Sequence, residues 1–463
     1  EGVVSSVVRV APLLVRGRVS AGRGVIDLLS VIAFTVSSWL LLAVLAGVRT
    51  FWTRQESPSQ AFLDALGPAA ASGVGELALW TLLAACAGVL LIVPVVTLGA
   101  AAARMGALGR DQRLATLRLL GVTSGQAITL STLETLLTAL AGALLGSVGY
   151  LLTVPLWSAV TFQATPLSAA EMLLPVWAIV GVVALVLVLA ALSSVSGLLR
   201  LRISPLGVAR REPRPGLRLG RLAVLPVAIV IWLVVAPSLS LTRAFAVSAV
   251  VIVVALGLFM GVINLVGPWL LQLSGVLLSR SGRPSSLLAG RRLLADPKGA
   301  WRSVAGLAFV GFTGGALVSL PDLAALDADP LIGLFAADLR TGTYLTLAIA
   351  FVVAAASTLL NQASAVLDRR RELQRLANLG VPLAFHDRTR LVEVVTPAAL
   401  ASLGSGGLAI FFFALLPKLA GGPAGLVLFV LALVAGVALV WAAGEACRPL
   451  LRSIVAEPEI RLT

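Results

Sequence analysis

The 463-residue chain is too apolar for a soluble domain. Its residues are 59% hydrophobic and only 12% charged, whereas a soluble domain is about half apolar and about a quarter charged. The composition therefore predicts an all-α integral membrane protein. The net charge of +14 does not indicate nucleic acid as a partner, because the basic residues gather in short loops between apolar stretches, as on the cytoplasmic face of membrane proteins.

Ten apolar stretches are each close to the roughly 20 residues that a helix needs to cross a bilayer. They lie at residues 28–50, 77–101, 127–151, 174–199, 222–241, 245–267, 302–320, 343–365, 391–416 and 424–446. Apolar residues continue past Pro268, which predicts either a bent extension or an interfacial helix there. The first span follows Arg16, Arg18 and Arg23 and is expected to stay as an anchor, preceded by an amphipathic helix on the inner leaflet.

The distribution of arginine orients these spans. Arginines gather before the first span and after the second, fourth, sixth and eighth spans, while the other connections contain few. By the positive-inside rule, both termini are expected in the cytoplasm. The longest external loops, 51–76 and the acidic 321–342 with Asp338, are too short for a sizeable extracellular domain, because a core that folds unaided needs more than about 40 residues.

Two short segments repeat one another in register. RDQRLATLRLLGV at 110–122 and RRRELQRLANLGV at 369–381 align without a gap, and the same offset places Glu134 on Glu393. In each copy, leucines three apart form an apolar stripe on a short basic helix, and a glycine supplies the left-handed residue that ends it. Both copies follow an even-numbered span, so the two halves are expected to be related by a pseudo-twofold axis normal to the membrane.

Each copy combines an arginine-rich helix, an L-x-x-LG-V sequence and a span with an early glutamate. This combination resembles the permease domain of the FtsX/MacB-like ABC transporter superfamily, here in two copies. The basic segments RLRISPLGVAR and LLAGRRLLADPKGAWRSVAGL are similar to those that flank such domains. The resemblance implies about ten transmembrane helices in a 4+2+4 arrangement, as in bacitracin-type exporters, in a bacterial cytoplasmic membrane. It places the first FtsX-like repeat at 1–212, a linker with the fifth and sixth spans at 213–283, and the second repeat at 284–463. Most such relatives carry a large extracellular domain, for which this chain has no room.

The resemblance also implies that ATP is hydrolysed by a separate subunit. A Walker A loop needs G-x-x-x-x-G-K-[ST], and neither Lys298 nor Lys418 lies in such a context, so the chain is expected to bind no nucleotide and to be no enzyme. Two copies of a cytoplasmic ABC ATPase, holding ATP and magnesium, would dock on the two basic helices. The alternative is that these helices merely lie in the bilayer interface. The residues expected to couple to the ATPases are Arg110, Arg113, Leu114, Leu117, Leu120, Gly121, Arg369, Arg371, Leu373, Leu376, Leu379 and Gly380.

Several ionisable, cysteine and small residues lie inside or beside the spans. Glu134 and Glu393 are intramembrane acidic groups, which are functional candidates by default; pairing with an arginine of the preceding loop is favoured over a proton relay. His386, in AFHDRTR, is expected to be a solvated loop histidine. With Cys86 and Cys447 it supplies too few ligands for a metal site. The small-residue runs AGALLGS and GLAFVGFTGG predict close helix packing.

Two functions remain open from the sequence. One is a permease that converts ATP-driven motion into export or extraction of a hydrophobic or amphiphilic substrate. The other is a mechanotransmission module that moves no substrate and signals to an extracellular partner. A membrane scaffold or secondary transporter unrelated to ABC proteins is a third, more distant reading.

Overall fold

The computed structural model describes residues 24–67, 77–89 with scattered positions from 91 to 102, 124–201, 223–238, 245–318, 330–415, 423–449 and 452. The chain divides into two compact units. Unit 1 comprises residues 1–43, 95–153 and 174–210, and unit 2 comprises residues 44–94, 154–173 and 211–463. The boundaries expected from the sequence repeat stay a prediction.

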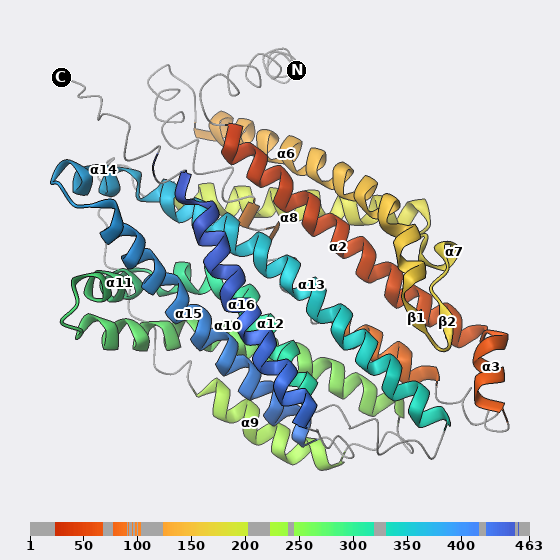
Figure 1. Cartoon of the computed structure of the whole chain (residues 1–463). Helices are drawn as coiled ribbons and strands as arrows, with labels where there is room; N and C mark the ends of the chain where they lie inside the picture. Colours follow the sequence, from red (N-terminus) through yellow and green to blue (C-terminus); the bar gives the residue numbers. More distant parts are fainter. Residues whose placement is uncertain are drawn as a thin grey trace, which may run out of the picture. The chain divides into compact units, whose positions relative to one another are not determined.

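Almost every described element is a helix (Figure 1). Helix α2 (Gly24–Glu56) begins in unit 1, which also holds α6 (Ser124–Thr153) and α8 (Val176–Leu201), and continues into unit 2. The first half of unit 2 contains α3 (Gln60–Leu66), the 3-10 helix η2 (Val154–Ala159), the hairpin β1 (Thr161–Phe162) and β2 (Thr165–Pro166), and α7 (Ala169–Met172). It continues with α9 (Val224–Val235), η4 (Ala236–Ser238), α10 (Phe245–Ser279), α11 (Pro284–Ala295), α12 (Pro297–Val318), α13 (Pro330–Asp368), α14 (Arg370–Asn378), α15 (Leu383–Ala414) and α16 (Pro423–Ala446).

Seven helices in the described part of the chain are long and apolar enough to cross a membrane, so the protein is a multi-pass membrane protein. They are Asp27–Glu56, Thr129–Ala159, Val176–Val195, Val250–Ser279, Gly333–Leu367, Ala384–Ala414 and Gly425–Ala446. The expected second and fifth spans coincide with the shorter apolar helices Leu77–Val89 and Val224–Val235. Helix α12, at the expected seventh span, is not among the seven. The count of ten therefore stays a prediction.

Two expected span boundaries were wrong. Helix α13 begins at Pro330 rather than near 343, and α15 begins at Leu383 rather than near 391. Both starts contain charged residues, which the search for apolar stretches assigned to loops; the structure keeps them helical because these charges find partners within unit 2. Helix α10 runs without interruption through Pro268, so the apolar residues behind that proline belong to the same helix.

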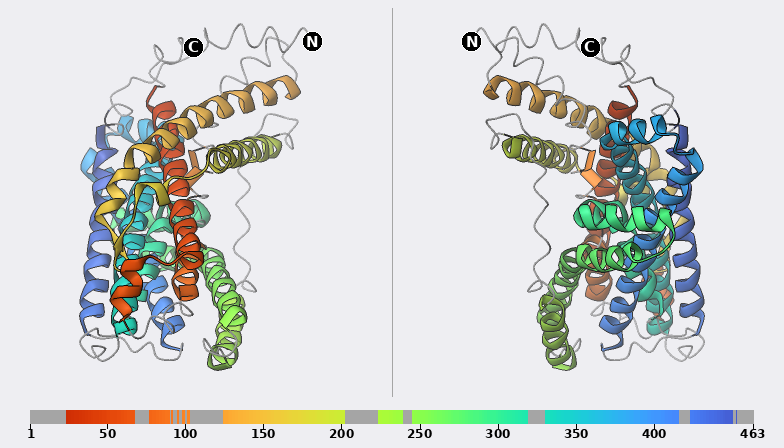
Figure 2. Two further views of the ribbon diagram at one scale, coloured as in Figure 1. Left: turned by 90° about the vertical axis from the view of Figure 1, so that its right-hand side faces the viewer. Right: turned by 90° about the vertical axis from the view of Figure 1, so that its left-hand side faces the viewer.

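Helix α12 forms the centre of unit 2. It packs against α10, α13, α15 and α16, and α16 in turn packs against both α13 and α15 (Figure 1 and Figure 2). The crossing of α12 with α15 is close because Gly311 faces the backbone of Ser402 and Gly315 faces Gly406. In unit 1, Gly142 of α6 lies as closely against Val31 and Phe34 of α2. Both small-residue runs therefore mediate close helix packing, as the sequence predicted.

A cap of polar contacts forms around Arg54, close to the end of α2 in unit 2. The Arg54 guanidinium is 5% exposed and donates hydrogen bonds to the Phe162 carbonyl at 2.8 Å and the Pro166 carbonyl at 3.0 Å. It also makes a bidentate ion pair with the Glu171 carboxylate, at 3.0 and 2.8 Å. Glu171 in turn completes a capping box with Ser168 at the start of α7. One arginine thus fixes both strands of the hairpin and the helix that follows.

Asp338 joins the same cap to α13. Its carboxylate accepts hydrogen bonds from the Trp80 indole nitrogen and the Gln163 backbone amide, each at 2.7 Å. Gln163 and Ala164 form the tip of the hairpin with φ of 55° and 57°, a conformation that non-glycine residues rarely adopt. The bond to Asp338 helps to hold this unusual turn. The sequence interpretation placed Asp338 in a loop and missed the hairpin, because the strands are only two residues each.

The close crossing of α12 and α15 predicts that Gly311→Ala destabilises the protein. An added Cβ would overlap the Ser402 backbone, and overpacking of this kind costs about 1–3 kcal/mol. Gly407→Ala on α15 is the matched control, since a Cβ there meets nothing within 4 Å and alanine favours the helix by up to about 1 kcal/mol. Thermal unfolding in detergent should show a lower Tm for Gly311→Ala alone. Equal Tm values for the two variants would contradict the packing described above.

The Arg54–Glu171 pair predicts a stability that falls at acidic pH. Burial alone would raise the pKa of Glu171, but hydrogen bonds from Arg54 and Ser168 and the charge of Arg54 outweigh it, so this pKa is lowered on folding. A lowered carboxyl pKa contributes stability that is complete above the ordinary carboxyl range and is lost as the pH falls through the lowered value. Glu171→Gln should therefore lower Tm near about pH 7, and its difference from the unaltered protein should shrink toward about pH 3. A difference that stays constant with pH would exclude an ionised Glu171.

Candidate functional site: the basic helix α14 and its ion pairs

Helix α14 is the second copy of the repeated basic motif. It begins with Arg370, directly after α13, and ends at Asn378 (Figure 1). Gly380 follows with φ of +81°, the left-handed conformation that the sequence predicted. The Val381 amide donates back to the Leu376 carbonyl at 3.1 Å, and the Gly380 amide donates to the Ala377 carbonyl at 2.9 Å, which closes the last turn as in a Schellman motif.

The three leucines of this copy differ in exposure. Leu373 is buried at 5%, Leu376 is half-buried, and Leu379 is 78% exposed. Leu373 therefore packs within unit 2, whereas Leu376 is partly exposed and Leu379 is largely exposed. The expected apolar stripe is present, but only its C-terminal part faces outward. The side chain of Arg371, another expected coupling residue, lies outside the described residues.

Glu393 of α15 is held between two arginines. Arg369, just before α14, approaches one carboxylate oxygen at 2.6 Å, and Arg292 of α11 approaches the other at 3.4 Å. The Glu393 side chain is 14% exposed, so the group is largely removed from solvent. Pairing with an arginine of the preceding loop was the interpretation favoured from the sequence, and Arg369 is that arginine. The second partner, Arg292, was not foreseen, because it lies 101 residues away in the chain.

Arg292 also pairs with α14 itself. Its other terminal nitrogen lies 2.8 Å from a Glu372 carboxylate oxygen, and its side chain is 11% exposed. Glu372 is 44% exposed and occupies the first turn of α14, where a negative charge is favoured by the helix dipole. The four residues Arg292, Glu372, Glu393 and Arg369 thus connect α11, α14 and α15. We call them the arginine–glutamate network.

A second group of charges joins the start of α15 to the end of α16. Asp387 lies 3.6 Å from Arg390 and 3.5 Å from Arg448, and Arg448 also pairs with Glu445. His386, beside Asp387, is 3% exposed, and neither ring nitrogen has a hydrogen-bond partner among the described residues. The expectation of a solvated loop histidine was therefore wrong. The reason is that α15 begins at Leu383, which places His386 in a helix with its ring facing the interior.

The first copy of the motif falls outside the described residues. Arg110, Arg113, Leu114, Leu117, Leu120 and Gly121 all lie between residues 103 and 123, where the structure describes nothing. Glu134 is described within α6 and is partly buried. The docking role of both copies stays a prediction. In the part of the chain that is described, His, Cys, Asp and Glu do not gather into a group that could hold a metal ion.

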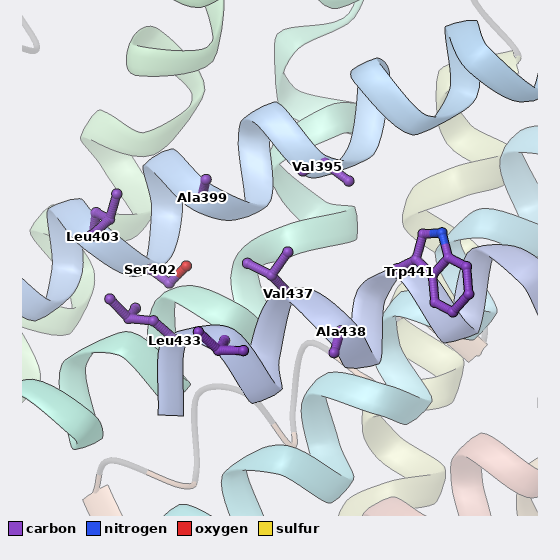
Figure 3. A pocket seen from close by; sticks show the side chains of 9 residues that line it. Val395, Ala399, Ser402, Leu403, Leu433, Val437, Ala438 and Trp441 are labelled. Atoms are coloured by element: carbon purple, nitrogen blue, oxygen red, sulfur yellow. The ribbon is translucent and has the colours of Figure 1, made fainter. Parts of the chain in front are cut away.

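An apolar groove lies between α15 and α16 in unit 2. Its volume is about 530 Å³ and it is lined by residues of these two helices (Figure 3). Val395 and Trp441 stand at one end and Leu403 at the other. Leu403, Val434 and Trp441 are each more than half exposed, and the only polar groups of the lining are the Ser402 hydroxyl, which donates to the Ala398 carbonyl, and the Trp441 indole. Such a groove suits an alkyl chain rather than a polar ligand.

The buried position of Glu393 predicts that its charge stabilises the fold. Glu393→Gln keeps the shape but leaves Arg292 and Arg369 without a counter-charge, which should lower the free energy of unfolding by about 1–3 kcal/mol. Glu372→Gln, at a site that is 44% exposed, should cost less than about 1 kcal/mol. Chemical unfolding in detergent would measure both. If Glu393 were protonated, as a proton relay requires, glutamine would replace it with little loss.

Comparison with known proteins finds one family match, which covers part of the chain. The sequence profile described as FtsX-like permease C-terminal matches residues 85–206. No curated protein and no solved structure matches the chain. The matched range includes α6, α8 and the first copy of the basic motif. Residues 85–206 are therefore an FtsX-like permease domain, and members of that family are membrane components rather than enzymes.

Proposed function

We propose that this chain is the transmembrane permease subunit of an ABC transporter. It receives ATP-driven motion from separate cytoplasmic ATPases through α14 and through its counterpart at 110–121. The FtsX-like permease domain supports the general role. The observation that carries the docking role is the exposed end of the leucine stripe on α14.

Leu379, at the end of α14, is 78% exposed. Helix α14 lies between the membrane-length helices Gly333–Leu367 and Ala384–Ala414 and belongs to neither. We infer that Leu379, together with half-buried Leu376 and the repeated motif, belongs to a surface that a protein partner covers. A short amphipathic helix with such a stripe fits into an apolar groove of another protein.

The charge of α14 indicates the chemistry of that partner. Its sequence RRELQRLAN contains three arginines and one glutamate, so the helix carries a net positive charge beside its leucines. A groove with an apolar floor and an acidic rim is complementary to it. The rim would influence the association rate and the salt dependence more than the affinity, because exposed charges are screened.

The repeat predicts two such docking sites and hence two ATPase subunits for each chain. ATP and magnesium would be held by those subunits, because this sequence has no G-x-x-x-x-G-K-[ST] loop. Both docking sites would face the cytoplasm of a bacterial cell, in agreement with the distribution of arginine. Purified without ATPase, the chain is expected to show no ATP hydrolysis.

The groove between α15 and α16 favours transport over mechanotransmission. It has an apolar lining and lies on two membrane-length helices, so a hydrophobic or amphiphilic substrate could enter it from the bilayer. Mechanotransmission requires instead an external surface for a protein partner. The described connections outside the spans are short, and the cap around Arg54 is small.

The docking role predicts that Leu376→Asp uncouples the ATPase at the second site. Loss of one buried leucine contact costs about 1.5–3 kcal/mol, and the new charge adds repulsion against an acidic rim. Together with Leu117→Asp at the first site, it should abolish co-purification of the ATPase. Asn378→Asp is the matched control, since it adds the same charge to α14 without removing apolar surface. Thermal unfolding should show that all variants remain folded.

Retention of coupled ATPases by the Leu117→Asp and Leu376→Asp double variant would assign these helices to the bilayer interface instead. Reconstitution into vesicles then separates the two functions. Transport predicts that a hydrophobic or amphiphilic compound stimulates ATP hydrolysis by the complex, whereas mechanotransmission predicts stimulation by a protein partner only.

A further inference from the structure

Arg292 holds two neighbouring helices at once. From α11 it reaches Glu372 of α14 at 2.8 Å and Glu393 of α15 at 3.4 Å. Glu393 is also bound by Arg369, so its charge would keep a partner without Arg292. Glu372, in contrast, has Arg292 as its ion-pair partner across elements. The contact between Arg292 and Glu372 is therefore the ionic link between α11 and the proposed docking helix.

Helix α11 packs closely against α10 and also contacts α15. Gly290 of α11 lies so close to α10 that a Cβ there would come within 2.6 Å of the Ser279 amide nitrogen and 2.8 Å of the Gly275 carbonyl oxygen. Leu293 of α11 is fully buried and lies beside Gly275 of α10. Packed backbones of this kind move together, because interiors are dense and deform little. A displacement of α11 would therefore carry the end of α10 with it.

Helix α10 leads from this contact into the centre of unit 2. Trp301 of α12 lies over Gly267 and donates to the Asn264 side chain at 3.2 Å. Farther along α10, Phe259 contacts the rings of Trp232 from α9 and Phe412 from α15. Trp232 stacks on Phe412 at 4.2 Å and donates to the Phe412 carbonyl at 3.0 Å. Helix α10 is thus held to α11 near its end and to α12 and α15 near its middle, and α9 is held to α15 through Trp232.

The first copy of the motif lacks the acidic residue that makes this link. In the ungapped alignment, Glu372 falls on Arg113. An arginine at that place would repel a residue equivalent to Arg292. The two docking helices are therefore not interchangeable, and the link from α14 to α11 belongs to the second repeat.

We propose that Arg292 is the positioning residue that makes α10 follow α14. Through Glu372 it ties the docking helix to α11, and through the Gly290 contact it ties α11 to α10. This gives the linker helices α9 and α10 a role, which is to carry the motion of the second ATPase site into the core of unit 2. The inference rests on the proposed docking of an ATPase at α14.

A charge swap tests this link in the reconstituted complex of permease and ATPases. Glu372→Arg should leave ATPase affinity nearly unchanged, because the leucines remain, but should lower the rate of ATP hydrolysis by the complex in phosphatidylethanolamine–phosphatidylglycerol vesicles about fivefold or more. Because Arg292 also pairs with Glu393, the compensating swap is Arg292→Glu with Glu372→Arg and Glu393→Gln, which restores an opposite pair without bringing two carboxylates together and should recover at least about half of that loss. Arg388→Glu, a reversal at an exposed arginine of α15, is the control and should have little effect. Rescue by the swap is a result that a purely structural loss would not give.

A distance measurement follows the motion directly. Spin labels at Leu287→Cys on α11 and Arg375→Cys on α14, with Cys86 and Cys447 replaced by alanine, report whether the two helices move as one. The distance should be the same without nucleotide and in an ATP-trapped state, and it should change between those states once Glu372→Arg is added. A distance that already changes in the unaltered pair would overturn the proposal.

The outcomes separate this inference from the proposed function. If the ATPases bind and remain fully coupled in Glu372→Arg, or if the swap fails to rescue, the positioning role of Arg292 is wrong while docking at α14 stands. If Glu372→Arg abolishes ATPase binding, Glu372 belongs to the docking surface and the positioning role is also wrong. If no ATPase binds the unaltered chain, the proposed function itself fails.

Discussion

Charge is scarce in this chain, and the cost of burying it decides how unit 2 is assembled. Only 12% of the residues are charged, and a charge removed from water is tolerated only when it is paired and hydrogen-bonded. Arg54 and Arg292, at 5% and 11% exposed, are the clearest cases. Each contacts at least two separate elements, so each buried guanidinium brings together segments that are far apart in the sequence. Apolar packing determines which helices are buried, and these arginines determine how their ends are aligned.

The contacts around Arg54 and those around Arg292 involve opposite ends of helix α13. Asp338, in the cap around Arg54, belongs to the first part of α13, and Arg369 of the arginine–glutamate network directly follows its last residue. A helix of 39 residues is about 58 Å long. Because both ends of α13 are held by buried polar contacts, a displacement of α14 has a rigid path to the cap. The hairpin of this cap is held by hydrogen bonds to Arg54 and Asp338, so the hairpin would move together with these two residues.

The sequence predicted the helical membrane architecture, the terminating Gly380, the close glycine crossings and an arginine partner for Glu393. These features depend on local pattern: apolar length, a left-handed glycine, small residues in a span and charges near in the chain. It missed Arg292 as a partner of Glu393, the Arg54–Glu171 pair and the burial of His386. Those contacts join residues about 100 or more apart or depend on which face of a helix turns inward, and neither is encoded in a local pattern. The N-terminal segments of α13 and α15, which contain Asp338 and Asp387, were assigned to loops for the same reason, because the partners of these charges lie far away in the chain.

The asymmetry between the two copies of the basic motif limits how the proposed machine can work. If both docking helices acted identically, the two halves would need the same connections behind them, but Arg113 stands where the second copy has Glu372. In the second half, the ion pair with Arg292 would connect the docking helix to α11 and, through α11, to α10, which lies in the expected linker and in neither repeat. The apolar groove is formed by α15 and α16, and α15 carries Glu393 of the same network. ATP-driven motion at α14 would therefore act on the groove directly through α15 and on the linker through α11, which makes the second half the better candidate for the substrate-moving half.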